Sequence, residues 1–209
     1  MINYMPIDLG HRLDKTEILD NFKPDKAWNY WSFEKLTESK GGKYCKHDIT
    51  KNAKTKYPKL WEYISHLPFT DISNVKINIQ KEKALPHIDF VSKEEGLELY
   101  KNNIDNEPCG YRFVVRGKND VLKLHNDNVV RTCFLPADTD CYVMNHTGGI
   151  HSIDDDKDRV VIYISGFIDK EKHLKIIERS MKKYKEFILW KIIYKYMIML
   201  FQRNIATAL

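Results

Sequence analysis

The chain has 209 residues, of which 43% are hydrophobic and 30% are charged, and its formal net charge is +5. This length suits one domain, or one domain with an extension, and it is enough to bury a full core. Much of the basic excess lies in one stretch, KEKHLKIIERSMKKYK. The charge therefore says little about a general nucleic-acid surface. Because basic and aromatic residues do not interleave along the predicted strands, we expect no nucleic-acid partner.

The four cysteines and the N-terminal stretch bear on the compartment. The cysteines form no CxxC pair and no small secreted framework, so we expect free thiols in a reducing compartment. The opening stretch MINYMPIDLGHRLDK has no cationic start followed by an apolar run. We therefore expect no signal peptide and a cytoplasmic location.

Residues 1–71 mix aromatic residues with short helical patterns. DKTEILDNF has apolar residues at the helical period after an aspartate, and YPKLWEYISHLPF has a proline near its start and another after its end. Both are predicted helices. KAWNYWSFEKL fits either a helix or a strand. We interpret the whole range as a flank that packs on the core, and its aromatic residues either join that core or roof a pocket.

Residues 72–168 have a β texture. Val75, Ile77 and Ile79 alternate with polar residues, a pattern typical of a half-buried strand. Further β-like runs follow at a spacing of about ten residues, separated by turn signals. The runs are GYRFVV, VLKLH, VVRTCFL, CYVMN and RVVIYISGF. Several short strands in this order predict a mainly β fold, an antiparallel sandwich or barrel such as a jelly roll.

Residues 169–209 form a predicted C-terminal helical extension. EKHLKIIERSMKKYKEF is amphipathic, and ILWKIIYKYMIMLF is apolar almost all round, interrupted by two lysines. A membrane span needs about 20 largely uncharged residues, so no integral span is expected. A long helix that packs on the protein or forms a homodimer is the first interpretation, and a helix lying on a membrane surface is the second.

A candidate metal site begins at LPHIDF, where His87 and Asp89 stand two residues apart. In a strand, residues i and i+2 point to the same side, so the two side chains can converge on one ion. Two histidines and one carboxylate on one face of an octahedron suit ferrous iron, with other positions open. His151 is the favoured third ligand, and His146 is its rival.

A second His-x-Asp pair, His125 and Asp127, competes with the first. Only 26 residues separate His125 from His151, by subtraction, against 64 from His87. The shorter separation is interpreted as too small for the strand crossing that such a site needs. On that ground His87 and Asp89 are preferred.

Arg159 follows the distal histidine and begins the run RVVIYISGF. An arginine can form a bidentate pair with a carboxylate, which suits the end group of a keto-acid. The competing interpretation is a surface ion pair with one of four nearby aspartates: Asp154, Asp155, Asp156 and Asp158. Arg116 and Arg131, on predicted strands, either face an acidic group of a substrate or lie on solvated strand faces.

Taken in order, LPHIDF, YRFVVRG and CYVMNHTGGIHSIDDDKDRVVIYISGF resemble the iron(II)/2-oxoglutarate dioxygenases. The similarity is greatest to the aspartyl/asparaginyl β-hydroxylase-like family, which includes free-proline hydroxylases. It covers about residues 72–168 and implies a double-stranded β-helix (jelly roll, cupin-like) core. It departs from the family's pattern at Val114, where a histidine is common, and at Arg116-Gly117, where Pro-Leu or Gly-Leu commonly follows.

The resemblance also implies roles for individual residues. His87, Asp89 and His151 would bind iron(II), and Arg159 would hold 2-oxoglutarate. Arg112 matches a family arginine that faces the cosubstrate, and Ser152 would line the pocket beside the distal histidine. The cofactors implied are Fe(II), 2-oxoglutarate and O2.

The function implied is hydroxylation of an unactivated carbon of an amino acid, free or within a peptide or protein. It is coupled to decarboxylation of 2-oxoglutarate to succinate. Two alternatives stay open: a non-catalytic cupin-like module that binds a metal or ligand, and an interaction protein that acts through its amphipathic C-terminal helix. Consumption of 2-oxoglutarate separates the first alternative from an enzyme.

Overall fold

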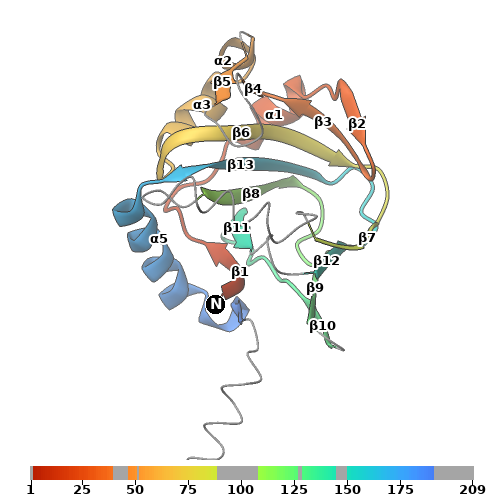
Figure 1. Cartoon of the computed structure of the whole chain (residues 1–209), viewed down its shortest axis with the longest axis vertical. Coiled ribbons are helices and arrows are strands. Elements are labelled where there is room, and N and C mark those ends of the chain that lie inside the picture. The colour runs from red at the N-terminus through yellow and green to blue at the C-terminus, as the bar shows by residue number, and fades with distance from the viewer. Residues whose placement is uncertain are drawn as a thin grey trace, which may run out of the picture.

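Two facing β-sheets make up the body of the computed structural model, with helices on one side (Figure 1). The structure describes residues 2–39, 47–50, 52–88, 108–126, 129–144 and 150–190. Statements about the fold and the site refer to these ranges.

The larger sheet has eight strands and the smaller has four. In spatial order the large sheet contains Leu189–Trp190 (β14), Ile2–Ile7 (β1), Cys141–Met144 (β11), Pro108–Arg116 (β8), Val160–Ile168 (β13), Phe69–Gln80 (β6), Trp31–Lys35 (β3) and Lys26–Trp28 (β2). The small sheet contains Val129–Thr132 (β10), Leu122–Asn126 (β9), Ile150–Ile153 (β12) and Ala84–His87 (β7). Thr37–Ser39 (β4) and His47–Ile49 (β5) form a separate two-stranded antiparallel sheet.

The path of the chain through the two sheets defines the fold. From β6 to β13 the chain passes between the large and small sheets, and every pairing along the way is antiparallel. The central large-sheet order β11-β8-β13-β6 faces the small-sheet order β10-β9-β12-β7. This is the topology of a double-stranded β-helix, so the mainly β, jelly-roll fold class expected from the sequence is confirmed.

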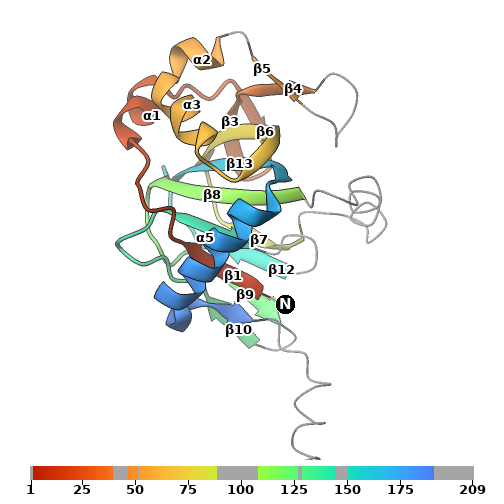
Figure 2. The ribbon, with the colours of Figure 1, turned by 90° about the vertical axis from the view of Figure 1, so that its left-hand side faces the viewer.

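The outer face of the large sheet carries the main hydrophobic core. Alternate residues such as Ile77, Phe113 and Ile162 point to this face and are at most 1% exposed. Three helices cover it, as the side view in Figure 2 helps to follow. They are Lys15–Asn21 (α1), Pro58–Ser65 (α3) and Lys170–Lys183 (α5), and the short Ala53–Lys56 (α2) and Lys185–Phe187 (η1) adjoin them.

A second, smaller core lies between the two sheets. Tyr4, Val114, Leu124, Cys133 and Ile153 belong to it, and each is at least nine-tenths buried. The faces of the two sheets that meet here are called the inner faces. At one end of this interior β7, β9 and β11 finish and β8, β10 and β12 begin. A side chain or ligand that lies in the interior at that end is therefore between the two sheets.

The predicted helices at 14–22 and 57–69 are confirmed as α1 and α3, and the amphipathic segment after residue 169 is confirmed as α5. The undecided segment KAWNYWSFEKL forms β2 and β3. The apolar run that begins at Ile188 enters β14 as a strand, and its remainder lies outside the described residues together with the predicted dimer contact. No helix within the described ranges has the length and hydrophobicity to cross a membrane. The division into flank, core and extension stays a prediction.

Candidate metal and cosubstrate site

His87 and His151 lie side by side on the inner face of the small sheet. They are register partners in the antiparallel pair β7–β12, and their ring centroids are 4.4 Å apart. His151 is 4% exposed, and its neighbour across the strand on the other side is the buried Leu124. Two histidines 64 residues apart in the sequence thus converge because the jelly roll pairs the strands that carry them.

The ring of His87 is held by its own strand. Its Nδ1 lies 2.6 Å from the carbonyl oxygen of Leu85, and because a carbonyl only accepts, Nδ1–H is the donor. In the neutral ring the lone pair is then on Nε2, an atom through which histidine ligates metals. Metal-binding histidines commonly have this arrangement, with the second ring nitrogen donating to a carbonyl or carboxylate.

The carboxylate of the expected triad, Asp89, lies outside the described residues, as do the rival ligands His146 and Asp127. Within the described residues there is no group of three or more His, Cys, Asp or Glu side chains able to hold a metal ion. The structure therefore brings together two of the three predicted ligands.

The structure places His125 and Ser152 on the other face of the small sheet. Ile150 pairs with His125 and is 48% exposed, whereas His151 and Ile153 point inward, so Ser152 shares the outer face with Ile150. Ser152 Oγ and His125 Nε2 are 2.8 Å apart. Ser152 is not on the inner face with His151, which departs from the expectation that it lines the pocket.

The ground on which His125 was set aside is wrong. β9 and β12 are direct neighbours in the small sheet, so 26 residues are enough to bring His125 beside the strand of His151. What separates His125 from the site is the face on which it lies. The alternation of side chains along β9, and not the length of the connection, excludes it.

Arg159 is buried in the interior at the end away from His87. It precedes β13, and its backbone carbonyl accepts from the amide of Gln80 at the end of β6. Its neighbour Val160 belongs to the outer core, so Arg159 points to the inner face, where it is 3% exposed. Burial raises the pKa of the Tyr4 hydroxyl, and the guanidinium of Arg159 acts on that pKa in the opposite direction.

No carboxylate pairs with Arg159 in the described part of the chain. Asp154 forms an ion pair with Lys123 at 2.6 Å, and Asp156 Oδ2 accepts from the amide of Lys118. The guanidinium Nε is buried without a hydrogen-bond partner, and so is the side-chain oxygen of Gln80 on the neighbouring strand. The surface ion pair considered for Arg159 is therefore not formed. A buried, unpaired cation is costly unless an anion joins it.

Gly117 fixes where the Arg159 side chain runs. Its φ is +115°, a conformation that residues other than glycine rarely adopt, and a Cβ there would lie 2.6 Å from Arg159 Cγ. The turn after β8 can therefore pass directly over the stem of the arginine only with a glycine at this position.

Arg112, the weaker cosubstrate candidate, lies on the inner face of the large sheet. Its guanidinium carbon is 5.0 Å from the centroid of the Tyr163 ring, and Lys76 Nζ is 5.4 Å from the same centroid. The three residues are register neighbours on β8, β13 and β6. Tyr163 is thus flanked by two cations, as cation–π interactions favour.

Sequence reasoning missed the polar side of β6 and the aromatic residue beside His87. The alternation of apolar and polar residues in β6 predicts a half-buried strand. Yet the polar residues Asn78 and Gln80 are only 8% and 2% exposed, on the inner face. Their alternation with apolar residues was the available signal. Tyr30, in the turn between β2 and β3, has its ring centroid 6.4 Å from that of His87, and no local pattern announced this contact.

The two histidines and Arg159 lie at different levels of the same interior. His151 pairs with Leu124 near the start of β12. Arg159 lies toward the other end of that strand, because the amide of Gln80 donates to its carbonyl and the Gln80 side chain donates to the carbonyl of Asp154, just after β12. The apolar inner residues between them exclude water.

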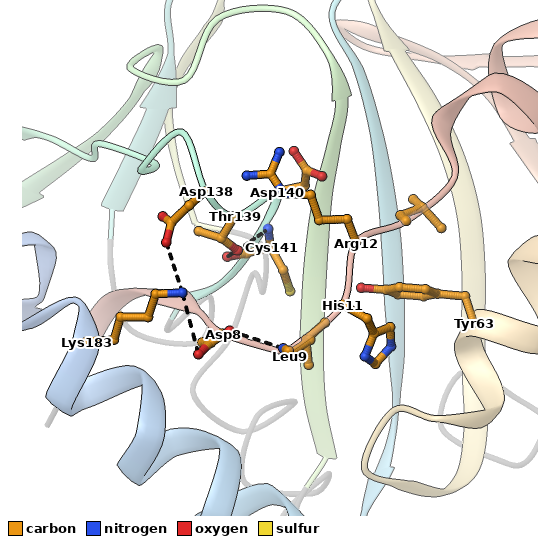
Figure 3. A pocket seen from close by; sticks show the side chains of 12 residues that line it. Asp8, Leu9, His11, Arg12, Tyr63, Asp138, Thr139, Asp140, Cys141 and Lys183 are labelled. Carbon is orange, nitrogen blue, oxygen red and sulfur yellow. Dashed lines mark hydrogen bonds and ion pairs between the residues drawn. The ribbon is translucent and has the colours of Figure 1, made fainter.

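A separate polar pocket of about 360 Å³ lies outside the jelly-roll interior (Figure 3). It is formed by the chain after β1, the chain before β11, Tyr63 of α3 and Lys183 of α5. Lys183 Nζ is 2.9 Å from Asp138 and 3.6 Å from Asp8, and Arg12 donates to the carbonyl of Ala137. Its cations are thus already bound within the protein, and it contains none of the predicted site residues.

No family model matches the chain, and no curated protein matches it. Solved structures do. A 2OG-Fe(II) oxygenase family oxidoreductase from Burkholderia pseudomallei is 11% identical and has a TM-score of 0.45, covering 75% of this chain and 77% of its own.

Two prolyl hydroxylases also match. The enzyme from Trichoplax adhaerens, in complex with a hypoxia inducible factor peptide fragment, is 14% identical with a TM-score of 0.42 over 77% of this chain and 80% of its own. A prolyl-4-hydroxylase from Pseudomonas putida is 9% identical with a TM-score of 0.43 over 80% and 93%. TM-scores below 0.5 describe a loose superposition, and no residue role or reaction passes from these proteins to this chain.

Proposed function

We propose that this protein is an iron(II)/2-oxoglutarate-dependent dioxygenase that hydroxylates an unactivated carbon of an amino acid, free or peptidyl. Its metal ligands are His87, Asp89 and His151, and Arg159 binds the far carboxylate of 2-oxoglutarate. Arg112 is a further candidate for contact with the cosubstrate. Ser152 is left out because it lies on the outer face of β12.

One observation carries the proposal: a buried arginine without an ion pair in the described part of the chain lies in the same interior as two adjacent histidines. A guanidinium in that position suits a carboxylate, and the histidine pair suits a divalent metal. 2-Oxoglutarate joins the two requirements in one small molecule, because it can chelate through one end and present a carboxylate at the other.

When bound, iron(II) and 2-oxoglutarate supply the oxidation of a C–H bond by dioxygen, with release of succinate and carbon dioxide. The residues of this chain bind and orient. The carbonyl of Leu85 holds the His87 ring with Nε2 as its basic nitrogen. Arg159 binds the far carboxylate of the cosubstrate. Gly117, which has no Cβ, leaves space for the aliphatic part of the Arg159 side chain. The inner core with Leu124 and Ile153 keeps water from the site.

The test is anaerobic titration of the protein with ferrous iron and 2-oxoglutarate, followed by visible spectroscopy. We expect the charge-transfer band of a chelated keto-acid in the wild type and no band in His151→Ala. His125→Ala is the matched control: it removes a histidine from the adjacent strand on the opposite face, and it should keep the band. A band that survives in His151→Ala would overturn the assignment of the metal ligands.

Exposure of the loaded protein to oxygen then separates an enzyme from a binding module. An enzyme consumes 2-oxoglutarate and releases succinate, with a low uncoupled rate before any substrate is added. A cupin-like module gives the band and no oxygen-dependent consumption. Arg159→Met should abolish the band at a cosubstrate concentration that saturates the wild type.

A further inference from the structure

Arg131 occupies a position that the proposed chemistry does not explain. It lies on β10, one of the two edge strands of the small sheet (Figure 1). Its register partner is Leu124, which is 1% exposed in the inner core. Residues that pair across antiparallel strands point to the same side, so Arg131 points to the inner face.

Arg131 is also in line with the two histidines. Across the small sheet the register runs from Arg131 to Leu124, from Leu124 to His151 and from His151 to His87. One strand, β9, lies between Arg131 and His151, so two strand spacings, about 10 Å, separate their backbones. Arg131 and His151 therefore flank Leu124 on the inner face of the small sheet.

No residue in the described part of the chain neutralises the charge of Arg131. The side chain is half-buried, and it forms no hydrogen bond or ion pair with any residue that the structure describes. Lys123, on the neighbouring strand and the outer face, does pair with Asp154 at 2.6 Å. The guanidinium of Arg131 is therefore available to a ligand, whereas the ammonium of Lys123 is already paired on the outer face.

The cosubstrate does not account for Arg131. Arg159 lies toward the end of β12, and in the proposed function a single 2-oxoglutarate would extend from the metal to it. Arg131 lies at the level of the metal instead, on the side away from His87. A second carboxylate, on a different molecule held beside the metal, fits this position.

We infer that Arg131 binds the carboxylate of the substrate, so that the substrate is a small carboxylic acid such as a free amino acid and not an internal residue of a protein chain. This inference rests on the proposed function. Arg131 acts as a specificity residue: it orients the acid so that one carbon is presented to the metal.

The test uses zinc-loaded protein with 2-oxoglutarate, in which no turnover takes place, and calorimetric titration. The probes are the twenty standard free amino acids and their α-carboxamides. We expect at least one acid to bind the wild type and its carboxamide to bind at least tenfold more weakly. Arg131→Gln should weaken the acid at least tenfold and leave the carboxamide unchanged, because only the charge-assisted pair is lost.

Lys123→Gln is the matched control, since it removes one positive charge from the outer face of the same sheet, and it should bind the acid like the wild type. Thermal unfolding confirms that both variants fold. The inference is overturned if no acid binds the wild type, if Arg131→Gln binds the acid equally well, or if acid and carboxamide bind alike.

Titration with ferrous iron and 2-oxoglutarate keeps this test apart from that of the proposed function. Arg131→Gln should retain the charge-transfer band of the wild type. Loss of the band in this variant alone would assign Arg131 to the cosubstrate and overturn the inference. Absence of the band in the wild type would overturn the proposed function, while the zinc titration still reports whether Arg131 binds an acid.

Discussion

A buried guanidinium without a partner lowers stability, because its desolvation is not repaid by an ion pair. Arg159 is in this position, with its Nε buried and unpartnered. Such a residue is retained only if it is needed for something other than folding. Stability and ligand binding should therefore respond in opposite directions when it is replaced.

We predict that Arg159→Met raises the free energy of unfolding by about 1 kcal/mol or more, since replacing buried ionic groups with apolar ones of similar volume is often stabilising. Urea unfolding without metal or cosubstrate measures this. The same variant should lose 2-oxoglutarate binding. Arg159→Lys keeps a charge and should not raise the free energy of unfolding. A decrease of more than 1 kcal/mol in the free energy of unfolding of Arg159→Met would contradict this explanation.

Gly117 permits a second prediction at this scale. Gly117→Ala should cost about 1–3 kcal/mol in the free energy of unfolding, because the backbone φ is positive and the new Cβ meets the Arg159 stem. It should also weaken 2-oxoglutarate binding, measured by the charge-transfer titration. Gly10→Ala is the control: its φ is +78° but a Cβ there would lie 3.9 Å from the nearest side chain. That variant should lose some stability and keep the cosubstrate.

Single residues show what could be foreseen from the sequence. His87 and His151 were identified by type and order, and the structure brings them to adjacent positions. The side of the sheet was harder. Ser152 was expected in the pocket because it follows His151, yet adjacent residues in a strand point to opposite faces. The inner face of a strand is the face that the opposite sheet covers. The sequence around Ser152 does not show which face that is.

The helices illustrate local signals that are strong enough to stand alone. α5 begins after Asp169, whose carboxylate accepts from the amide of Lys172, so the sequence marks its start with a side-chain cap. The pKa of Asp169 is below its usual 3.8, chiefly because of that backbone hydrogen bond. A depressed pKa in the folded state means that the ionised cap stabilises the fold above about pH 4 and that this contribution is lost as the pH falls further.

We therefore predict that Asp169→Ala lowers the midpoint of thermal unfolding at pH 7 and that the difference from the wild type shrinks as the pH is taken below 4. Parallel melts of the two proteins between pH 7 and pH 3 measure this. Asp169→Asn, which keeps an acceptor without the charge, should fall between them at pH 7. A difference that grows in acid would contradict the assigned role of the ionised cap.

Strands were predicted less completely than helices, and for a physical reason. β6, β8, β9, β10, β11 and β13 follow runs of β-type residues that were recognised. β7 and β12 were not among the recognised runs, because the site's polar residues interrupt their β-type side chains. Their strand conformation comes from pairing with each other and with β9, which is a long-range effect.

The polar residues of β6 belong at the same scale. A half-polar strand normally predicts one wet face, and here the polar face lines the interior between two sheets. An alternating strand that lies inside a jelly roll is thus a signal for a ligand site. The alternation is visible in the sequence, but only the position of the opposite sheet shows that the polar face is buried.

At the scale of the whole molecule, the site joins strands that are far apart in sequence, so a ligand that binds it stabilises the fold as a unit. We predict that manganese with 2-oxoglutarate, without oxygen, raises the free energy of unfolding by about 2.7 kcal/mol at a hundredfold excess over Kd. For a chain of this size that corresponds to a rise of roughly 5–10 °C in Tm.

Differential scanning calorimetry measures the shift. His151→Ala should show almost none of it, whereas His125→Ala should show the full effect, because its ring lies on the outer face of the small sheet. An equal shift in all three proteins would mean that the metal binds elsewhere on the surface.

The first strand has an unusual place in the large sheet. β1 lies between β11 and β14, with Ile7 opposite Cys141 and Ile2 opposite Trp190. During synthesis on the ribosome, both neighbours emerge long after β1 itself, a wait of roughly ten to thirty seconds at about 5–20 residues per second. Throughout that interval the nascent N-terminal strand has neither edge paired. Completion of the sheet is thereby postponed until Trp190 has been synthesised.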